Sequence, residues 1–277
     1  MRHNEGQVQT ADGVSLYSQS WLPDGEMKAV VAFSHGQAEH SGRYDHVGRA
    51  LAGAGYGLVM ADLRGHGRSP GIRGHVMRWQ EYLYDYDAVI TAARQIAPQV
   101  PLFIGGHSMG GLIALSKAVS APPACQGVVV SGAALRLAFD PPAWKVAVGR
   151  LLSSFLPSLT LSTGLDANGL SHDRTVVDAY VSDPLVHDRV STRGYTEIMA
   201  AQAATLAGAA KLTLPLLILH GGADSIAHPE GSREFYQRAG STDKILKVYE
   251  GLYHEILNEY EKEAILGDIL TWLDAHL

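Results

Sequence analysis

The sequence is poor in cysteine and in positive charge, and it has no long apolar run. Among its 277 residues there is one cysteine, Cys125, so an intramolecular disulfide is excluded. The formal net charge of −6 argues against a nucleic-acid partner, because phosphate binding requires a concentrated basic surface. No stretch approaches the roughly 18 apolar residues of a membrane-spanning helix, so none is expected.

The amino-terminal residues are polar. Residues 1–10 contain no apolar stretch that would form the hydrophobic part of a signal peptide. Together with the single cysteine, this favours a cytoplasmic enzyme in a reducing or redox-indifferent compartment. A chain from which a signal had already been removed would show the same pattern.

Short apolar runs bounded by turn residues alternate with segments of helical spacing. Such runs are typical of buried parallel strands. We expect such strands at 29–33, 57–61, 101–104, 127–130, 214–219 and 245–249, and helices at 44–53, 79–97, 112–120 and 261–277. The Asp12-Gly13 turn signal predicts a β-hairpin formed by 6–10 and 14–22. The alternation predicts an α/β fold, with a mostly parallel central sheet flanked by helices on both faces.

Residues 135–212 interrupt this alternation. They hold no clear strand and include a Pro141-Pro142 pair, a leucine-rich stretch and a polar stretch. A long insertion at such a point is usually functional. We therefore expect a core formed by 1–134 and 213–277, with 135–212 as a helical cap inserted between two strands.

A Gly-x-Ser-x-Gly motif at residues 106–110 lies between an apolar strand and a helical segment. In that context Ser108 is expected on a sharp strand-to-helix turn, which exposes its Oγ above the sheet and requires small neighbours. The helix N-terminus would add positive potential near a developing oxyanion. A serine that only caps a helix is the alternative, but the strand, the helix and the glycines together favour a nucleophile.

A serine hydroxyl becomes an effective nucleophile when a base takes its proton. On such a turn the partners follow in the order Ser, Asp or Glu, His. Asp224 ends a glycine-rich loop after a buried strand, and His254 lies in the loop after the last strand. We predict that His254 is the base, and that Asp224 is the acid that holds its tautomer and stabilises the imidazolium.

The chain has 13 histidines, so the choice of His254 depends on position. His35, His66 and His107 each lie next to a glycine, in what we expect to be loops that they serve. Asp62 follows a strand and is expected to brace its loop. His254 follows the last strand, where the order along the chain places the base.

Acyl transfer also requires two donors aimed at the carbonyl oxygen as it becomes negative. The backbone N–H of Met109, next to the nucleophile, is one candidate. The backbone N–H of Gln37, in the loop at residues 34–41, is the other. Alternatively His35-Gly36 only makes a turn, although such a turn would also aim the donor.

Several stretches resemble monoacylglycerol lipases and related lysophospholipases. They are residues 35–44 (HGQAEHSGRY), 62–69 (DLRGHGRS), 106–110 (GHSMG), 183–186 (DPLV) and 249–255 (YEGLYHE), and the similarity runs from about residue 16 to 255. The resemblance implies the α/β-hydrolase fold, a lipid-facing cap and hydrolysis of monoacylglycerols to glycerol and fatty acid. It assigns the same residues to the site: Ser108, Asp224 and His254 as triad, and Gln37 and Met109 as oxyanion donors.

Gln37 stands where this family often has a small residue. Only its backbone is needed for the donor, whereas its side chain alters the pocket wall.

The predicted cap carries apolar residues at helical spacing, namely Trp144, Val148, Leu151, Leu152 and Phe155. This stripe has three interpretations. It lines an acyl tunnel, it packs onto the core, or it makes transient contact with a membrane or lipid surface.

The sequence thus predicts an ester hydrolase that works through an acyl-enzyme on a small lipid ester and requires no metal or organic cofactor. A short-chain carboxylesterase and a lysophospholipase share every predicted catalytic residue and stay open as alternatives. A non-catalytic ligand receptor on the same fold also stays open. Epoxide hydrolases and haloalkane dehalogenases use an aspartate as the nucleophile on this strand-to-helix turn, called the elbow below, so Ser108 argues against both.

Overall fold

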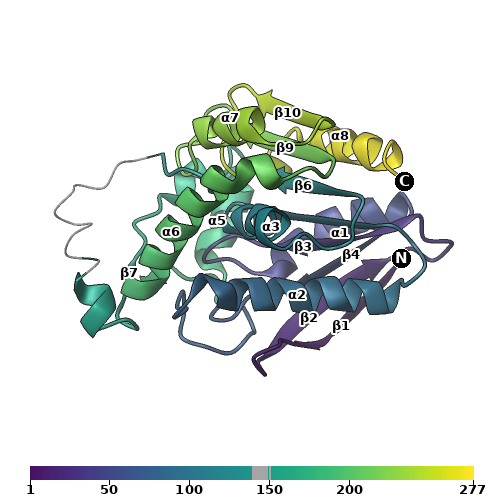
Figure 1. The fold of residues 1–277 in the computed structure, drawn as a ribbon. Coiled ribbons are helices and arrows are strands. Elements are labelled where there is room, and N and C mark those ends of the chain that lie inside the picture. Colours follow the sequence, from purple (N-terminus) through teal and green to yellow (C-terminus); the bar gives the residue numbers. More distant parts are fainter. Residues whose placement is uncertain (139–148, 150) are drawn as a thin grey trace.

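One 8-stranded sheet forms the centre of the computed structural model, which describes residues 1–138, 149 and 151–277 (Figure 1). Its strand order is β1-β2-β4-β3-β5-β6-β9-β10. The strands are β1 (Arg2–Gln9), β2 (Ser15–Leu22), β3 (Ala29–Ser34), β4 (Tyr56–Ala61), β5 (Leu102–His107), β6 (Gly127–Ser131), β9 (Leu216–Gly221) and β10 (Lys244–Tyr249).

The sheet is parallel apart from its amino-terminal edge. β1 pairs with β2, and β2 with β4, in antiparallel fashion, whereas all neighbours from β4 to β10 are parallel. The loops after β3, β5, β9 and β10 therefore open on one edge of the sheet. In open α/β sheets this edge is where ligands bind.

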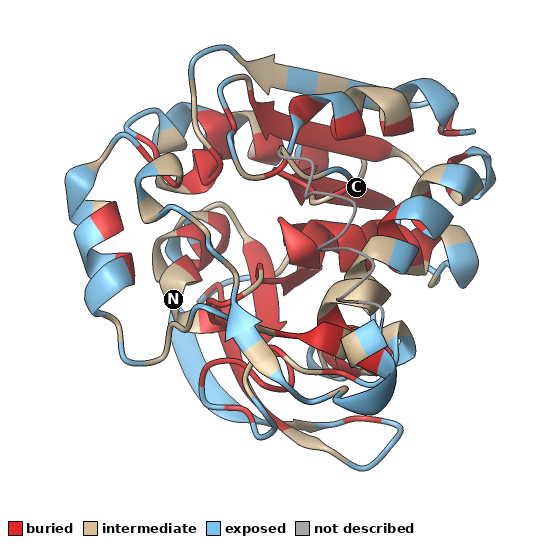
Figure 2. Ribbon diagram, turned by 90° about the vertical axis from the view of Figure 1, so that its left-hand side faces the viewer, coloured by how far each residue is buried: buried red, intermediate tan, exposed pale blue. Residues whose placement is uncertain are grey.

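The inner strands are buried along their whole length, as Figure 2 shows in red. Apolar on both faces, they need helices on both sides. The helices of the core are α1 (Asp45–Gly53), α2 (Trp79–Ile96), α3 (Met109–Ser120), α7 (Pro229–Arg238) and α8 (Lys262–Asp274). Side chains of α2, α3 and α7 share one buried cluster with the sheet, and those of α1 and α8 share the other.

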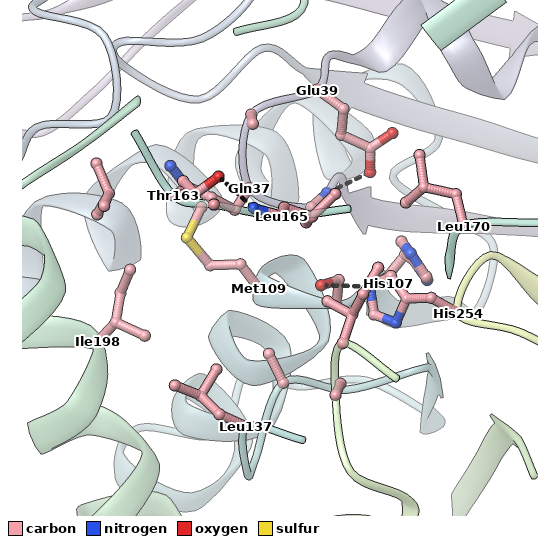
Figure 3. Close-up of a pocket in the computed structure, with 18 of the residues that line it drawn as sticks. Gln37, Glu39, His107, Met109, Leu137, Thr163, Leu165, Leu170, Ile198 and His254 are labelled. Carbon is pink, nitrogen blue, oxygen red and sulfur yellow. Dashed lines mark hydrogen bonds between the residues drawn. The ribbon is translucent and has the colours of Figure 1, made fainter. Parts of the chain in front are cut away.

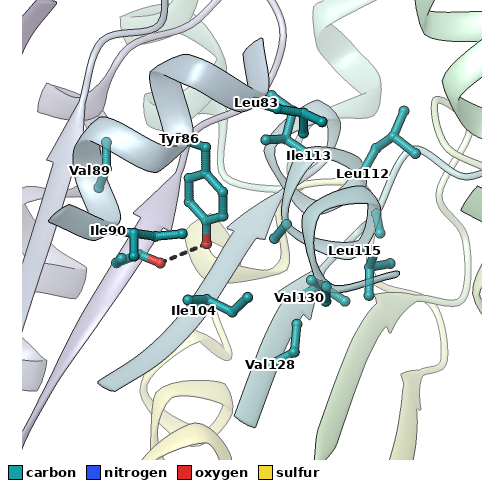
Figure 4. Close-up of a cluster of buried hydrophobic side chains, with 14 of the residues drawn as sticks. Leu83, Tyr86, Val89, Ile90, Ile104, Leu112, Ile113, Leu115, Val128 and Val130 are labelled. Atoms are coloured by element: carbon teal, nitrogen blue, oxygen red, sulfur yellow. Dashed lines mark hydrogen bonds between the residues drawn. The ribbon is translucent and has the colours of Figure 1, made fainter. Parts of the chain in front are cut away.

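The first cluster contains one polar anchor. In Figure 4, apolar residues of α2 and α3 converge on Ile104, Val128 and Val130 of the strands. The Tyr86 hydroxyl lies among them and donates to Ala32 O of β3 at 3.0 Å, while accepting from Gly105 N at 2.8 Å. The phenol thus satisfies backbone groups beside the elbow strand, which would otherwise be costly to bury.

Between β6 and β9 the chain leaves the sheet. This part contains helical residues 151–155, β7 (Thr160–Ser162), α5 (Arg174–Ser182), β8 (Arg189–Ser191) and α6 (Thr192–Gly208). β7 and β8 form a two-stranded antiparallel sheet, and α6 packs beside α3 (Figure 1). The expectation that 135–212 holds no strand was wrong. Each strand has three residues of mixed polarity, so neither produces an apolar run.

Short 3₁₀ helices are η1 (Ser41–Tyr44), η2 (Ala167–Gly169), η3 (Ala209–Lys211) and η4 (Ile256–Asn258). The structure also moves two predicted boundaries around the elbow. β5 continues to His107, and α3 begins at Met109. Gly105 and Gly106 interrupt the apolar pattern of the strand but pair with its neighbours, and Gly110 and Gly111 do the same to the helical pattern while lying within the helix. His107 is therefore a strand residue, and its predicted place in a loop was wrong.

In the parts of the chain that the structure describes, no helix has the length and apolar character needed to cross a membrane.

Candidate active site

Ser108 occupies the turn between β5 and α3 in a strained conformation. Its φ is +53°, and Ala38 (φ +70°) is the other non-glycine residue with positive φ in the described chain. The turn is pinned by Ser108 N, which donates to Ser131 O at 3.0 Å. Strain of this kind persists only where the surroundings enforce it, and it clusters at functional sites.

The glycines around the turn are required by close packing. A Cβ on Gly110 would lie 2.1 Å from Ser34 O, and one on Gly106 would lie 2.3 Å from Gly110 C. Real Cβ atoms do not approach backbone this closely. The two glycines therefore let β3, β5 and α3 converge beneath the serine, as the motif predicts.

The structure brings Ser108, His254 and Asp224 into one hydrogen-bonded chain. His254 Nε2 lies 2.9 Å from Ser108 Oγ, and His254 Nδ1 lies 2.7 Å from Asp224 Oδ2. All three residues are buried. Because the carboxylate accepts from Nδ1–H, Nε2 keeps the lone pair that faces the serine hydroxyl.

Asp224 is itself held from three sides. Its Oδ1 accepts from Ile226 N at 2.8 Å and Ala227 N at 2.9 Å. His220 Nε2 lies 3.1 Å from Oδ2, and its Nδ1 is 2.7 Å from Ser232 Oγ. Sequence reasoning missed His220, although its place at the end of β9, four residues before Asp224, was a usable signal.

Charges within this hydrogen-bonded chain, together with burial, shift the pKa values of His254, Asp224 and the neighbouring His107. Burial by itself lowers the pKa of His254, but the Asp224 carboxylate outweighs burial and leaves that pKa raised above its ordinary value of 6.5. For Asp224 burial acts in the opposite direction, and the charge and hydrogen bonds of His254 and His220 hold its pKa well below the usual range. Burial, with His254 as neighbour, lowers the pKa of His107 to about 4.

The loop after β3 carries the predicted oxyanion donor Gln37. Gln37 and Met109 line the same cavity as Ser108 and His254 (Figure 3). The loop approaches the serine so closely that a Cβ on Gly36 would lie 3.1 Å from Ser108 Cβ. Gly36 N donates to Glu39 Oε1 at 2.6 Å, so the loop is also the tight turn of the alternative interpretation.

His35 and Asp62 brace loops, as expected. His35 Nε2 accepts from Leu63 N at 2.9 Å, which leaves Nδ1–H to donate to Gly36 O at 2.8 Å. Asp62 Oδ1 accepts from Ser41 N at 2.8 Å. These hydrogen bonds connect the loop after β3 to the loop after β4.

A buried ion network, which sequence reasoning missed, joins this loop to the histidine loop. Arg43 Nη1 lies 2.7 Å from Glu39 Oε2, and the Arg43 guanidinium binds Glu255 through two contacts of 2.6 and 2.7 Å. The Tyr44 hydroxyl donates to Glu39 at 2.7 Å. Burial would raise the pKa of Glu39, but the Arg43 charge lowers it to about 2, so Glu39 is ionised at neutral pH.

The cavity over Ser108 has a volume of about 300 Å³ and is mostly apolar. Besides the core loops, it is lined by Leu165 and Leu170, and by Tyr195, Ile198, Met199 and Gln202 of α6. The residues described in the predicted stripe do not line it. Leu151 is 60% exposed and Phe155 77%, so the tunnel and core-packing interpretations were wrong for these two. Trp144 and Val148 lie outside the described residues.

Among residues 1–138, 149 and 151–277, no group of three His, Cys, Asp or Glu side chains is placed to hold a metal ion.

A family model described as "Serine aminopeptidase, S33" matches residues 25–261, which is most of the chain. The chain belongs to this S33 family. A monoacylglycerol lipase of Mycolicibacterium smegmatis is 37% identical over 266 residues, covering 96% of this chain and 95% of the relative.

Two solved structures of similar proteins share the fold of this S33 family member. A monoacylglycerol lipase of Paleococcus ferrophilus has a TM-score of 0.85 and 35% identity, covering 95% of this chain and 99% of the other. A soluble variant of the Saccharomyces cerevisiae monoglyceride lipase, in complex with a substrate analog, has a TM-score of 0.90 and 27% identity. The likeness covers 100% of this chain and 96% of the other. These likenesses, with the sheet order, confirm the predicted α/β-hydrolase fold.

Proposed function

We propose that this protein is a monoacylglycerol lipase, in which Ser108 is the nucleophile, His254 the base and Asp224 the acid. The observation that carries the proposal is the hydrogen-bonded chain from Asp224 through His254 to Ser108, opening into an apolar cavity beside a tight backbone loop. The named activities of the similar proteins are those of monoacylglycerol lipases, which supports the choice of substrate.

The first half-reaction forms an acyl-enzyme. Ser108 Oγ attacks the ester carbonyl while His254 Nε2 takes the hydroxyl proton. The carbonyl oxygen becomes negative, and the backbone N–H groups of Gln37 and Met109 are the donors proposed to stabilise it. His254 then gives its proton to the glycerol oxygen as the bond between that oxygen and the acyl carbon breaks.

The second half-reaction repeats these steps with water. His254 takes a proton from water, which attacks the acyl carbon, and the tetrahedral intermediate again faces Gln37 and Met109. The proton on His254 returns to Ser108 Oγ as the fatty acid leaves. Asp224 keeps its negative charge throughout and favours the imidazolium that forms twice in the cycle.

We propose residues 135–212 as a cap over a core of 1–134 and 213–277. The cavity supports this division, because residues between 163 and 202 line it together with loops of the core. The apolar lining contributed by α6 suits an acyl chain, whose burial is favourable by about 0.8 kcal/mol per methylene group.

The same insertion presents apolar side chains to solvent, which supports a transient contact with lipid surfaces. The exposed large ones within residues 151–161 are Leu151, Phe155, Leu156, Leu159 and Leu161. A run of this kind suits a protein that collects its substrate from a membrane. Replacing Leu151 and Phe155 by serine is expected to reduce sedimentation with phosphatidylcholine vesicles, while hydrolysis of a soluble ester stays unchanged.

The test of the function is a chain-length profile. Hydrolysis of p-nitrophenyl esters from C2 to C16 and of 1-monoacylglycerols is measured for wild type, Ser108→Ala and the control Ser15→Ala, which alters a serine on β2. We expect turnover of monoacylglycerols with medium or long chains. Ser108→Ala should lose at least about 10⁴-fold in kcat, and Ser15→Ala should match wild type.

Other outcomes would reject the proposal in different ways. Activity confined to C2–C4 esters would identify a short-chain carboxylesterase. A preference for lysophospholipids over monoacylglycerols would identify a lysophospholipase. Tight binding of lipid with almost no turnover would indicate a receptor, and full activity in Ser108→Ala would refute the assignment of the nucleophile.

A further inference from the structure

The loop that carries Gln37 adopts a conformation that its own sequence does not favour. Ala38 has φ +70°, in the left-handed region where a Cβ is crowded and glycine is the usual residue. A short loop with alanine at this position would relax unless other contacts held it. The relaxation would rotate the peptide groups on either side of Ala38, close to the Gln37 N–H.

A segment of the insertion supplies such contacts. Residues 183–191, called the strap below, lie between α5 and α6 and begin with the Asp-Pro-Leu-Val motif. Strap residue His187 donates its backbone N–H to Ala38 O at 3.0 Å. The Gln37 side chain donates from Nε2 to Arg189 O at 3.0 Å. The bonds thus hold the left-handed residue and its neighbour.

A third contact holds the far end of the loop. His40 Nε2 lies 2.9 Å from Asp183 Oδ2, and the His40 side chain is 9% exposed. Asp183 also orders the strap, because its Oδ1 accepts from Leu185 N at 2.8 Å. One carboxylate therefore fixes the fold of the strap and its attachment to the loop.

The strap is in turn anchored on the core. Ser191 N donates to Gly74 O at 2.9 Å, and Ser191 Oγ lies 2.8 Å from His75 Nδ1. The backbones meet so closely at this point that a Cβ on Gly74 would lie 2.0 Å from Arg189 O. The carboxyl end of the strap is thus supported by the core, so the strap does not simply follow the loop.

We propose that the strap is a positioning element of the oxyanion hole, with Asp183 as its principal positioning residue. It holds Ala38 in the left-handed conformation and so keeps the Gln37 N–H aimed at the reacting carbonyl. This inference rests on the proposed function. It gives the insertion a part in the chemical step, in addition to its part in covering the cavity.

The role makes a specific kinetic prediction. An oxyanion donor interacts most strongly with the transition state, so misaligning it lowers kcat and leaves KM nearly unchanged. Losing one donor outright costs about 10²- to 10³-fold. Partial misalignment in Asp183→Ala is expected to lower kcat about 10-fold. The matched control Asp178→Ala removes an exposed carboxylate of α5 and should match wild type.

A second substitution distinguishes positioning from general damage. Glycine adopts φ near +70° without the steric cost of a Cβ. Ala38→Gly in the Asp183→Ala background should therefore restore most of the lost kcat, since the loop then needs less support. If kcat falls in Asp183→Ala and Ala38→Gly does not restore it, the carboxylate acts on overall structure and the proposal is overturned.

Amide hydrogen exchange provides a readout that does not depend on activity. Asp183→Ala should accelerate exchange at Gly36 and His187, and leave the elbow peptide at residues 105–112 unchanged. Unchanged exchange in the loop overturns the proposal, whether or not the wild type hydrolyses an ester. A wild type that hydrolyses no ester would by itself refute only the proposed function. Should Asp183→Ala fail to fold, His40→Ala removes the contact between His40 and Asp183 by deleting its other partner. We expect the same changes in kcat and in amide exchange.

Discussion

Ser108 and Gln37 face one cavity, but different parts of the molecule hold them. Ser108 is fixed by backbone packing of the core, where glycines let two strands and a helix converge. The Gln37 side chain donates to Arg189 O of the strap, and the strap's His187 N donates to the neighbouring Ala38 O. We therefore expect changes in the insertion to affect the loop that carries Gln37 more than they affect Ser108, the proposed nucleophile.

The histidine loop combines both kinds of support. On the core side, Asp224 holds the imidazole of His254. On the side of the insertion, His254 N donates to Gly169 O at 3.3 Å and Glu255 N to Leu170 O at 2.8 Å. The proposed catalytic geometry thus depends on the core for the position of Ser108 Oγ. It depends partly on the insertion for the positions of Gln37 and His254.

The largest expected effect comes from breaking the core-side support of His254. Asp224→Asn removes the negative charge and places an amide where a carboxylate accepted from Nδ1–H, so the wrong tautomer is favoured. We expect kcat to fall about 10⁴-fold. Steady-state kinetics on a p-nitrophenyl ester measure this, with Asp178→Asn as control. A loss below ten-fold would mean that Asp224 is not the acid.

The next effect tests the packing under the serine. Gly110→Ala places a Cβ 2.1 Å from Ser34 O, so β3 or α3 must move. We expect a loss of about 3 kcal/mol in the free energy of unfolding, measured by urea titration, together with loss of activity.

The matched control for this prediction is Gly267→Ala in α8, where a Cβ would meet no atom within 4 Å apart from the local backbone of its own helix. There alanine should stabilise the protein by roughly 0.5–1 kcal/mol, since glycine weakens a helix. Equal effects at the two positions would contradict the packing argument.

A smaller effect is expected from the insertion-side support of the histidine loop. Glu259 is fully buried and accepts from Tyr253 N at 2.8 Å and His172 N at 2.8 Å, which joins the two segments. Glu259→Gln replaces one accepting oxygen by a donor and should lower kcat about ten-fold by loosening the loop. The exposed Glu263→Gln on α8 is the control, and a raised KM with normal kcat would argue for a role in binding instead.

The smallest effect concerns pH. In the proposed mechanism, proton abstraction requires neutral His254, whose pKa is raised above 6.5. Activity should therefore fall as pH decreases through that raised pKa, to about half of its maximum at the pKa itself. Asp224 stays ionised there because its pKa lies far lower. A pH profile of kcat/KM with an acid limb centred below 6.5 would contradict the raised pKa.

What the sequence could predict was local. A strand, a glycine-rich turn and a helix follow one another around Ser108, so the motif and its context lie within one short stretch. Asp224 and His254 each follow a recognisable strand, and the parallel order places those strand ends on one edge. The structure brings these three residues together as expected.

The sequence could not predict contacts between distant segments. Arg43 and Glu255 are 212 positions apart, and no local pattern connects them. Gln37 and Arg189 meet across 152 positions through a backbone oxygen, which carries no sequence signal at all. The tunnel and core-packing interpretations of the apolar stripe failed for a related reason. Helical spacing does not indicate whether a face of a helix meets the core, a cavity or solvent.

The bridge from Glu39 through Arg43 to Glu255 restricts how members of this family can be recombined. The guanidinium neutralises carboxylates on two loops that come from opposite ends of the chain. A chimera that takes one loop from each of two parents must bring the arginine and both acids together, because an orphaned buried charge costs about 3–5 kcal/mol. Swaps that cut between residues 43 and 255 are safe only when both parents carry the whole bridge.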